Sequence, residues 1–124
     1  MTYGFDEIRV DEVSAGTVIT LVFNDTIKKQ DFEYFVPQLE TFMASRDKIR
    51  LLIELRDFNG ITPGALWEDT KFGFHHFDDI ERLAIVGDSR WEEVMAEFIK
   101  PFTKAVVKYF DQTQLDSANK WIRS

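Results

Sequence analysis

The sequence predicts a single α/β domain with a mixed sheet of about five strands and about four helices. Two short apolar runs, Leu51 to Leu55 and Arg82 to Val86, have the continuous hydrophobic character of strands that are covered on both faces. Each run leads through turn residues into a helix start: Thr62 and Pro63 after the first, and an S-x-x-E capping pattern at residues 89–92 after the second. A strand that feeds directly into a helix is half of a βαβ unit, and such units place their loops at the carboxyl ends of the strands.

The first residues of the chain predict an antiparallel hairpin. Apolar and charged residues alternate from Phe5 to Val13, and a second strand-like stretch runs from Gly16 to Phe23 after a Ser-Ala-Gly turn. Asn24, Asp25 and Thr26 are turn-forming residues, and we expect them to end the second strand.

A helix is predicted between Asp31 and Ser45. Its apolar residues recur at helical spacing and form one stripe: Phe32, Phe35, Val36, Leu39, Phe42 and Met43. Pro37 lies inside this pattern, and its ring removes a backbone hydrogen bond. We therefore expect either a bend at Pro37 or a helix in two pieces.

The remaining elements follow in alternation. Asp57, Asn59 and Gly60 are expected to end the strand that begins at Leu51. The elements expected after it are a helix over 63–77, a strand over 82–86, a helix from 91 that Pro101 ends, a strand over 106–109 and a helix over 115–122. The predicted order is ββαβαβαβα, in one domain spanning residues 1–124 without a linker, a repeat or a low-complexity stretch.

Composition excludes several classes of function. The chain has 124 residues, 44% of them hydrophobic, which suits one domain with a single core. It has no Cys, so a disulfide, a thiolate nucleophile and a Cys-ligated metal are all excluded. A net charge of −7 argues against a nucleic-acid partner. The amino terminus lacks the pattern of a secretory signal, and we expect a cytoplasmic protein.

No catalytic or metal-binding constellation is recognisable in the sequence. His75 and His76 are adjacent, so on a helix they diverge, whereas paired ligands need a spacing of three or four residues. Asp69, Asp78 and Asp79 are not held as a pair across a substrate, as acid–base chemistry requires. We therefore expect neither an enzyme nor a cofactor-dependent protein.

Seven short sequence words carry a resemblance to a known family. They are residues 57–63 (DFNGITP), 65–69 (ALWED), 71–73 (KFG), 85–88 (IVGD), 91–92 (WE), 100–104 (KPFTK) and 109–111 (YFD). They resemble the words of a family of small uncharacterised SpoIIAA-like domains, and the element order resembles the STAS fold of anti-sigma-factor antagonists. The resemblance implies a STAS/SpoIIAA-like α/β sandwich with the order ββαβαβαβα.

The antagonists carry a phosphorylated Ser in the loop after the third strand. Counting from Glu54, that Ser falls at Pro63 and the residue before it at Thr62, so the usual phosphoacceptor is missing. Thr62 is then a candidate regulatory phosphoacceptor, or else an N-cap worth ~1 kcal/mol. By this resemblance, the alternative function is a regulatory protein-interaction module.

The leading prediction is a non-catalytic module that binds an apolar or lipid-like ligand between the helices over 63–77 and 91–102. The STAS fold is topologically similar to the lipid-binding CRAL-TRIO fold, and members of the SpoIIAA-like family look as if these helices can part over an apolar pocket. The predicted ligand-binding residues are Trp67, Phe74, Phe77, Trp91, Met95, Phe98 and Phe102. The same side chains also fit a plain core against the sheet.

One aromatic residue does not fit the apolar stripe of the helix over 63–77. Leu66, Thr70, Gly73, Phe74 and Phe77 share one face, and at 100° per residue Phe72 points nearly opposite to it. We expect Phe72, with Lys71 beside it, to contact a membrane surface, a protein partner or a second subunit. An ordinary exposed aromatic side chain is the alternative.

Overall fold

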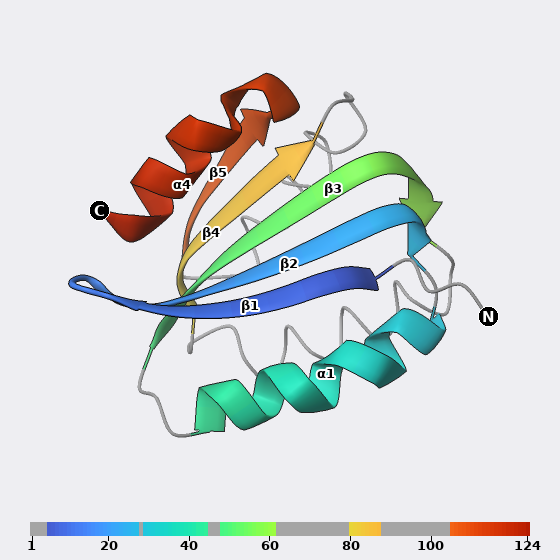
Figure 1. Ribbon diagram of the computed structural model, residues 1–124, viewed down its shortest axis with the longest axis horizontal. Coiled ribbons are helices and arrows are strands. Elements are labelled where there is room, and N and C mark those ends of the chain that lie inside the picture. The colour runs from blue at the N-terminus through green and yellow to red at the C-terminus, as the bar shows by residue number, and fades with distance from the viewer. Residues whose placement is uncertain (1–4, 28, 45–47, 62–79, 88–104) are drawn as a thin grey trace.

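The computed structural model describes residues 5–27, 29–44, 48–61, 80–87 and 105–124, and in them a five-stranded sheet lies between two helices (Figure 1). The elements are β1 (Phe5–Val13), β2 (Gly16–Ile27), α1 (Lys29–Ala44), β3 (Ile49–Ile61), β4 (Ile80–Gly87), β5 (Val106–Asp111), the short 3₁₀ helix η3 (Gln112–Gln114) and α4 (Leu115–Arg123). The predicted helices over 63–77 and 91–102 lie outside the described residues.

The sheet is mixed, as the sequence predicts, and its strand order is β1-β2-β3-β4-β5. β1 and β2 form the antiparallel hairpin, which closes where Val13 pairs with Gly16. Gly16 has a φ of 136°, in the region that side chains with a Cβ rarely enter, which explains glycine at the point where the chain reverses. β2 to β5 are all parallel, so their carboxyl ends meet at one edge of the sheet.

Two strands run further than the sequence suggests. The turn-forming residues Asn24 to Thr26 do not end β2, and residues 57–60 do not end β3. The two extensions pair with each other: after a register shift beyond Asn24, Thr26 pairs with Gly60 and Ile27 pairs with Ile61. Both predicted strand ends are wrong, because pairing with a neighbouring strand outweighs the local turn preference of Asn, Asp and Gly.

α1 is a single helix with Pro37 inside it, so the two-piece alternative is wrong. Two side chains of α1 donate hydrogen bonds to backbone carbonyl groups four residues before them, close to the proline. Thr41 donates its hydroxyl to the Pro37 carbonyl at 2.9 Å, and the Gln38 amide donates to the Tyr34 carbonyl at 3.2 Å. Leu39 and Met43 of the predicted stripe are buried, with Val36 and Phe42 packed beside them.

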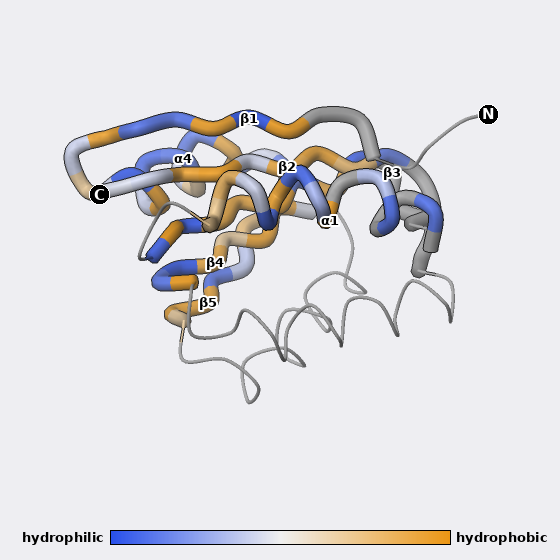
Figure 2. Tube along the Cα trace, turned by 90° about the horizontal axis from the view of Figure 1, so that it is seen from below, coloured by the Kyte–Doolittle hydropathy of each residue, from blue (hydrophilic) through white to orange (hydrophobic). Residues whose placement is uncertain are grey.

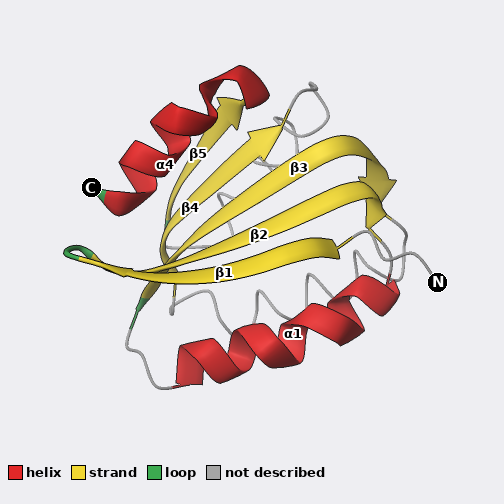
Figure 3. Cartoon of the chain, in the orientation of Figure 1, coloured by secondary structure: helices red, strands yellow, loops and turns green. Residues whose placement is uncertain are grey.

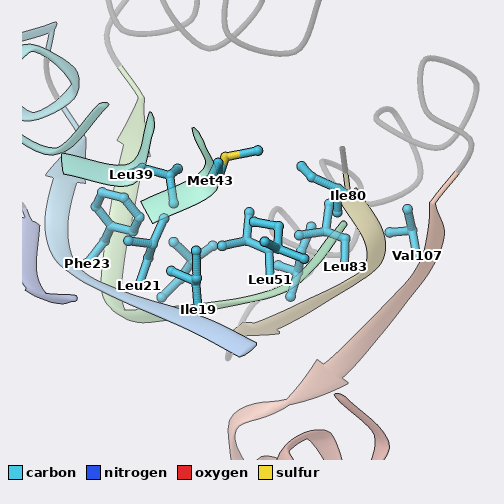
Figure 4. Close-up of a cluster of buried hydrophobic side chains, with 12 residues drawn as sticks. Ile19, Leu21, Phe23, Leu39, Met43, Leu51, Ile80, Leu83 and Val107 are labelled. Atoms are coloured by element: carbon cyan, nitrogen blue, oxygen red, sulfur yellow. The ribbon is translucent and has the colours of Figure 1, made fainter. Parts of the chain in front are cut away.

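Successive residues of β3 point to opposite faces of the sheet and build two hydrophobic clusters. On the face that α1 covers, Leu51 and Leu55 join Leu39 and Met43 of α1 (Figure 4). On the opposite face, Leu52 packs with Ala118 and Ile122 of α4. Figure 3 shows the two helices on opposite sides of the sheet. These faces are called the α1 face and the α4 face below.

The outer strand β1 differs from the inner strands in its hydropathy. Its trace alternates between hydrophilic and hydrophobic colours, as the sequence pattern predicts (Figure 2). Ile8 and Val10 pack against the cluster on the α1 face, while Arg9 is exposed on the other side. By contrast, Ala84, Ile85 and Val86 of β4 are all buried, which confirms the prediction that this run lies inside the sheet.

α4 follows a side-chain cap formed by Asp111. The Thr113 backbone N–H donates to the Asp111 carboxylate at 3.0 Å, and the Asp111 N–H donates to the Gln114 side chain at 3.2 Å. This reciprocal capping box starts η3, and α4 follows without a break. Ala118 and Ile122 are the buried residues of α4, and they form the face that packs on the sheet.

Candidate functional site

The carboxyl edge of the parallel strands is the part of the sheet from which the predicted site segments depart. β3 ends at Ile61, directly before Thr62, and its parallel neighbour β4 ends at Gly87, directly before Asp88. Segments 62–79 and 88–104 therefore leave the sheet from the same edge and from adjacent strands. In α/β sheets this edge is where ligands usually bind.

The predicted site residues themselves lie outside the described residues. They are Thr62, Trp67, Lys71, Phe72, Phe74 and Phe77 in the first segment, and Trp91, Met95, Phe98 and Phe102 in the second. The structure places the start of each segment, and the roles of these ten side chains stay predictions.

The two points of departure are staggered along the strands. The last residues that pair β3 with β4 are Glu54 and Val86, and β4 ends one residue later at Gly87. β3 continues to Ile61, which is about 20 Å further along its contour at ~3.3 Å per residue. Segments 62–79 and 88–104 therefore start at different levels along the strands.

Tyr109 fixes the end of β4. Its hydroxyl donates to the Gly87 carbonyl at 2.9 Å, and its side chain packs against the hydrophobic cluster on the α1 face. The register places Tyr109 opposite Ile85, so the side chain reaches towards the end of the neighbouring strand. The sequence places Tyr109 in a predicted strand and in one of the family's short motifs. A Tyr in a strand needs a hydrogen-bond partner for its hydroxyl, but the sequence does not indicate which group this partner is.

A buried carboxylate lies on the α4 face of β3. The Glu54 side chain is 4% exposed, and it accepts two hydrogen bonds from Arg56, at 3.1 Å from Nε and 3.3 Å from Nη2. Glu54 and Arg56 are two residues apart on one strand, so they share a face. A two-pronged guanidinium contact satisfies a buried carboxylate well, and we assign Glu54 a structural role. In the sequence, Glu54 was visible as the one charged residue inside the run from Leu51 to Leu55.

Asp111 at the end of β5 is held ionised by its capping contacts. The Thr113 backbone N–H, and then the Thr113 hydroxyl at 2.8 Å, lower the pKa of the Asp111 carboxyl below its usual value. The Asp111 carboxylate is at the surface and accepts both hydrogen bonds from Thr113 in the turn before α4. Asp111 therefore ends β5 and caps the helix that follows.

The described ranges contain no group of His, Asp and Glu side chains arranged to hold a metal ion. Over the same ranges, no helix is both long enough and apolar enough to cross a membrane.

Comparison with known proteins decides the family. A family model described as SpoIIAA-like matches residues 18–123, which includes all of β3, β4, β5 and α4. The chain belongs to the SpoIIAA-like family. The resemblance inferred from the seven sequence words is thereby confirmed, and the match also takes in most of β2 and the whole of α1. Comparison with curated proteins gives no match.

The SpoIIAA-like fold is also found in a solved structure similar to this chain. That structure is an uncharacterized protein of the DUF3478 family from Shewanella loihica PV-4, described as having a SpoIIAA-like fold. The TM-score is 0.83 and the identity 23%, over 98% of this chain and 96% of that chain. At this identity the likeness establishes the shared fold alone, and the predicted α/β SpoIIAA-like class is confirmed.

Proposed function

We propose that this SpoIIAA-like chain is a non-catalytic module that binds an apolar or lipid-like ligand between segments 62–79 and 88–104. One observation carries the proposal: β3 and β4 are adjacent and parallel, so both segments begin at the same edge of the sheet. The two segments hold the predicted aromatic stripes, with Trp67, Phe74 and Phe77 in one and Trp91 and Phe98 in the other. Pockets for small molecules are mostly lined by such side chains.

A hydrophobic cluster on the α1 face supports the proposal. It extends across β2 to β5, from Phe23 to Val107, and includes Leu39 and Met43 of α1. Sites for apolar ligands are lined mainly by hydrophobic side chains such as these.

A peripheral membrane contact through Phe72 and Lys71 belongs to the same proposal. A protein that takes an apolar ligand from a bilayer must contact the bilayer surface. An exposed aromatic side chain next to a cation is suited to that surface. Phe72 lies opposite the apolar stripe of its segment when the segment is drawn as a helix. Phe72 is therefore not expected to line the proposed ligand site.

A fluorescent fatty acid tests the ligand site directly. Cis-parinaric acid accepts excitation energy from nearby tryptophan, and the chain has three Trp, of which Trp67 and Trp91 are in the proposed site segments. Trp121 lies on α4 and packs on the α4 face, which makes it the matched control. We expect saturable binding, with energy transfer lost in the Trp67→Phe, Trp91→Phe double variant and retained in Trp121→Phe.

Two outcomes contradict the proposal. Absence of saturable binding would exclude a site for this class of ligand. Energy transfer that depends on Trp121 alone would place the fatty acid on the α4 face instead. The regulatory alternative is tested separately by phosphopeptide analysis of protein isolated from its host, where phosphate on Thr62 would favour a partner switch.

A further inference from the structure

Two cations converge on one aromatic ring at the outer end of the α4 face. The guanidinium carbon of Arg82 lies 5.2 Å from the centroid of the Trp121 ring, and the Lys108 ammonium lies 5.3 Å from it. Phe110 packs against the same ring, with centroids 5.9 Å apart. The four side chains come from β4, β5 and α4, which lie side by side in Figure 1.

Neither cation has a carboxylate partner within the described residues. Arg82 donates to the Trp121 carbonyl and to the Ser124 hydroxyl, each at 2.9 Å, and Lys108 contacts only the ring. Other arginines of the described chain do have acidic partners: Arg50 pairs with Glu81 and Arg123 with Asp11. In a chain of net charge −7, this leaves a local positive potential that a carboxylate would relieve.

The strand that carries Lys108 lies at the edge of the sheet. β5 pairs with β4, and no second strand pairs with it in the part of the chain that the structure describes. Val106 at its start is 56% exposed, and an exposed apolar edge is a template for pairing with another strand. The opposite edge strand, β1, is different, because Asp6, Glu7, Asp11 and Glu12 make it unattractive to an acidic strand.

We propose that the edge of β5 together with α4 forms a docking surface for an extended acidic segment of a partner protein. This β5–α4 surface consists of Arg82, Val106, Lys108, Phe110 and Trp121. A strand added to β5 gains main-chain hydrogen bonds, and its alternate side chains lie on the α4 face. Carboxylates at those positions come close to Lys108, with Arg82 one strand further in, and apolar residues between them pack along the sheet.

Charge decides between this occupant and its competitors. A second copy paired through β5 about a two-fold axis would bring the Lys108 cations of both copies to the same edge, which opposes association. Nucleic acid would meet two suitable cations but also the repulsion of the net charge of −7. An acidic peptide satisfies both the local cations and the strand edge.

A labelled synthetic peptide tests the surface. The probe is an eight-residue peptide of alternating Glu and Val, and its partner control has Lys in place of Glu. Fluorescence anisotropy is measured for the wild type, for Lys108→Glu and for Lys48→Glu. Lys48 is exposed at the start of β3, so its reversal changes the net charge equally at a different place. The amide chemical shifts of β5 report where the peptide binds.

We expect the acidic peptide to bind the wild type, with affinity at least tenfold lower for Lys108→Glu and within twofold for Lys48→Glu. The shifted amides should be those of Val106–Asp111, and the basic peptide should not bind. Equal losses of peptide affinity in Lys108→Glu and Lys48→Glu would show that net charge alone explains the effect, and would overturn the proposal. So would absence of binding at millimolar peptide, shifts confined to other strands, or tighter binding of a single-stranded RNA oligomer. Lys108→Gln, which adds no negative charge, should give an intermediate loss.

Discussion

Arg50 and Arg82 lie opposite each other on β3 and β4, and both donate hydrogen bonds to the last turn of α4. Arg50 reaches the carbonyl groups of Ile122, at 3.2 Å, and of Ser124, while Arg82 reaches that of Trp121 at 2.9 Å. The last carbonyls of a helix have no partner within the helix and carry partial negative charge. Two arginines from neighbouring strands supply the missing donors and so hold α4 against the sheet.

Replacing Arg50 should therefore loosen α4. The Arg50 side chain is 8% exposed, so Arg50→Met removes the donor to the buried Ile122 carbonyl and should reduce the free energy of unfolding by ~1 to 3 kcal/mol. Urea denaturation followed by circular dichroism measures the change. Lys48→Met, at an exposed position, should stay within ~0.5 kcal/mol of the wild type. Equal stability of the two variants would show that the arginine contacts do not hold α4.

Leu55 tests the interior of the sheet. It is 6% exposed, it belongs to the cluster on the α1 face, and it pairs with Phe23 of β2. Leu55→Ala removes buried methyl groups and should cost ~2 to 5 kcal/mol in denaturant melts. Val106→Ala, at an exposed position of β5, should cost less than ~0.5 kcal/mol. A loss below ~1 kcal/mol for Leu55→Ala would contradict the packing described for β3.

The sequence predicts the strands well where burial decides them and poorly where the chain could turn. Alternation defines β1, and the continuous apolar runs define the cores of β3 and β4, because each pattern reflects how many faces are covered. The ends of β2 and β3 were missed because Asn24 to Thr26 and residues 57–60 favour turns locally. Their pairing is a contact between distant segments, which no local pattern contains.

The sequence predicts the candidate site as a set of mostly aromatic residues, with Thr62, Lys71 and Met95 among them. The structure adds what this set lacks: the shared edge from which both segments start, and the stagger between Ile61 and Gly87. It also adds two contacts without a local sequence signature, from Tyr109 to Gly87 and from Arg50 to Ile122. Both join residues far apart in the chain, so only the folded arrangement could reveal them.

The pKa of Asp111 should lie below its ordinary value, and side-chain NMR titration measures it. The Thr113 backbone N–H is the main cause and the Thr113 hydroxyl the second, so Thr113→Ala should raise this pKa only part of the way back. Because the folded-state pKa is lowered, the cap stabilises the protein above the unfolded pKa. That contribution is lost as the pH falls through the folded value. An unshifted Asp111 pKa in the wild type would contradict the capping geometry.

The predicted membrane contact of Phe72 gives opposite outcomes for its two alternatives. If Phe72 is a surface contact, Phe72→Glu should keep the melting midpoint nearly unchanged, within ~0.5 kcal/mol, and should reduce flotation with liposomes. Phe98→Glu is the control, because Phe98 lies on the apolar stripe of its segment and its replacement should destabilise strongly.

Either of two results would contradict the prediction that Phe72 contacts a membrane. Unfolding of Phe72→Glu, like that of Phe98→Glu, would show that Phe72 belongs to the core. A stable Phe72→Glu that floats with liposomes as the wild type does would leave Phe72 as an ordinary exposed aromatic side chain.

The proposed ligand itself is tested most directly by mass spectrometry of an organic extract of the protein, purified from its native host without detergent. A module that holds an apolar or lipid-like molecule between segments 62–79 and 88–104 should release one class of such molecule, in near-stoichiometric amount. A mock purification from the same host without the protein serves as the blank. An extract of the wild type that contains no more lipid than this blank would contradict the proposal.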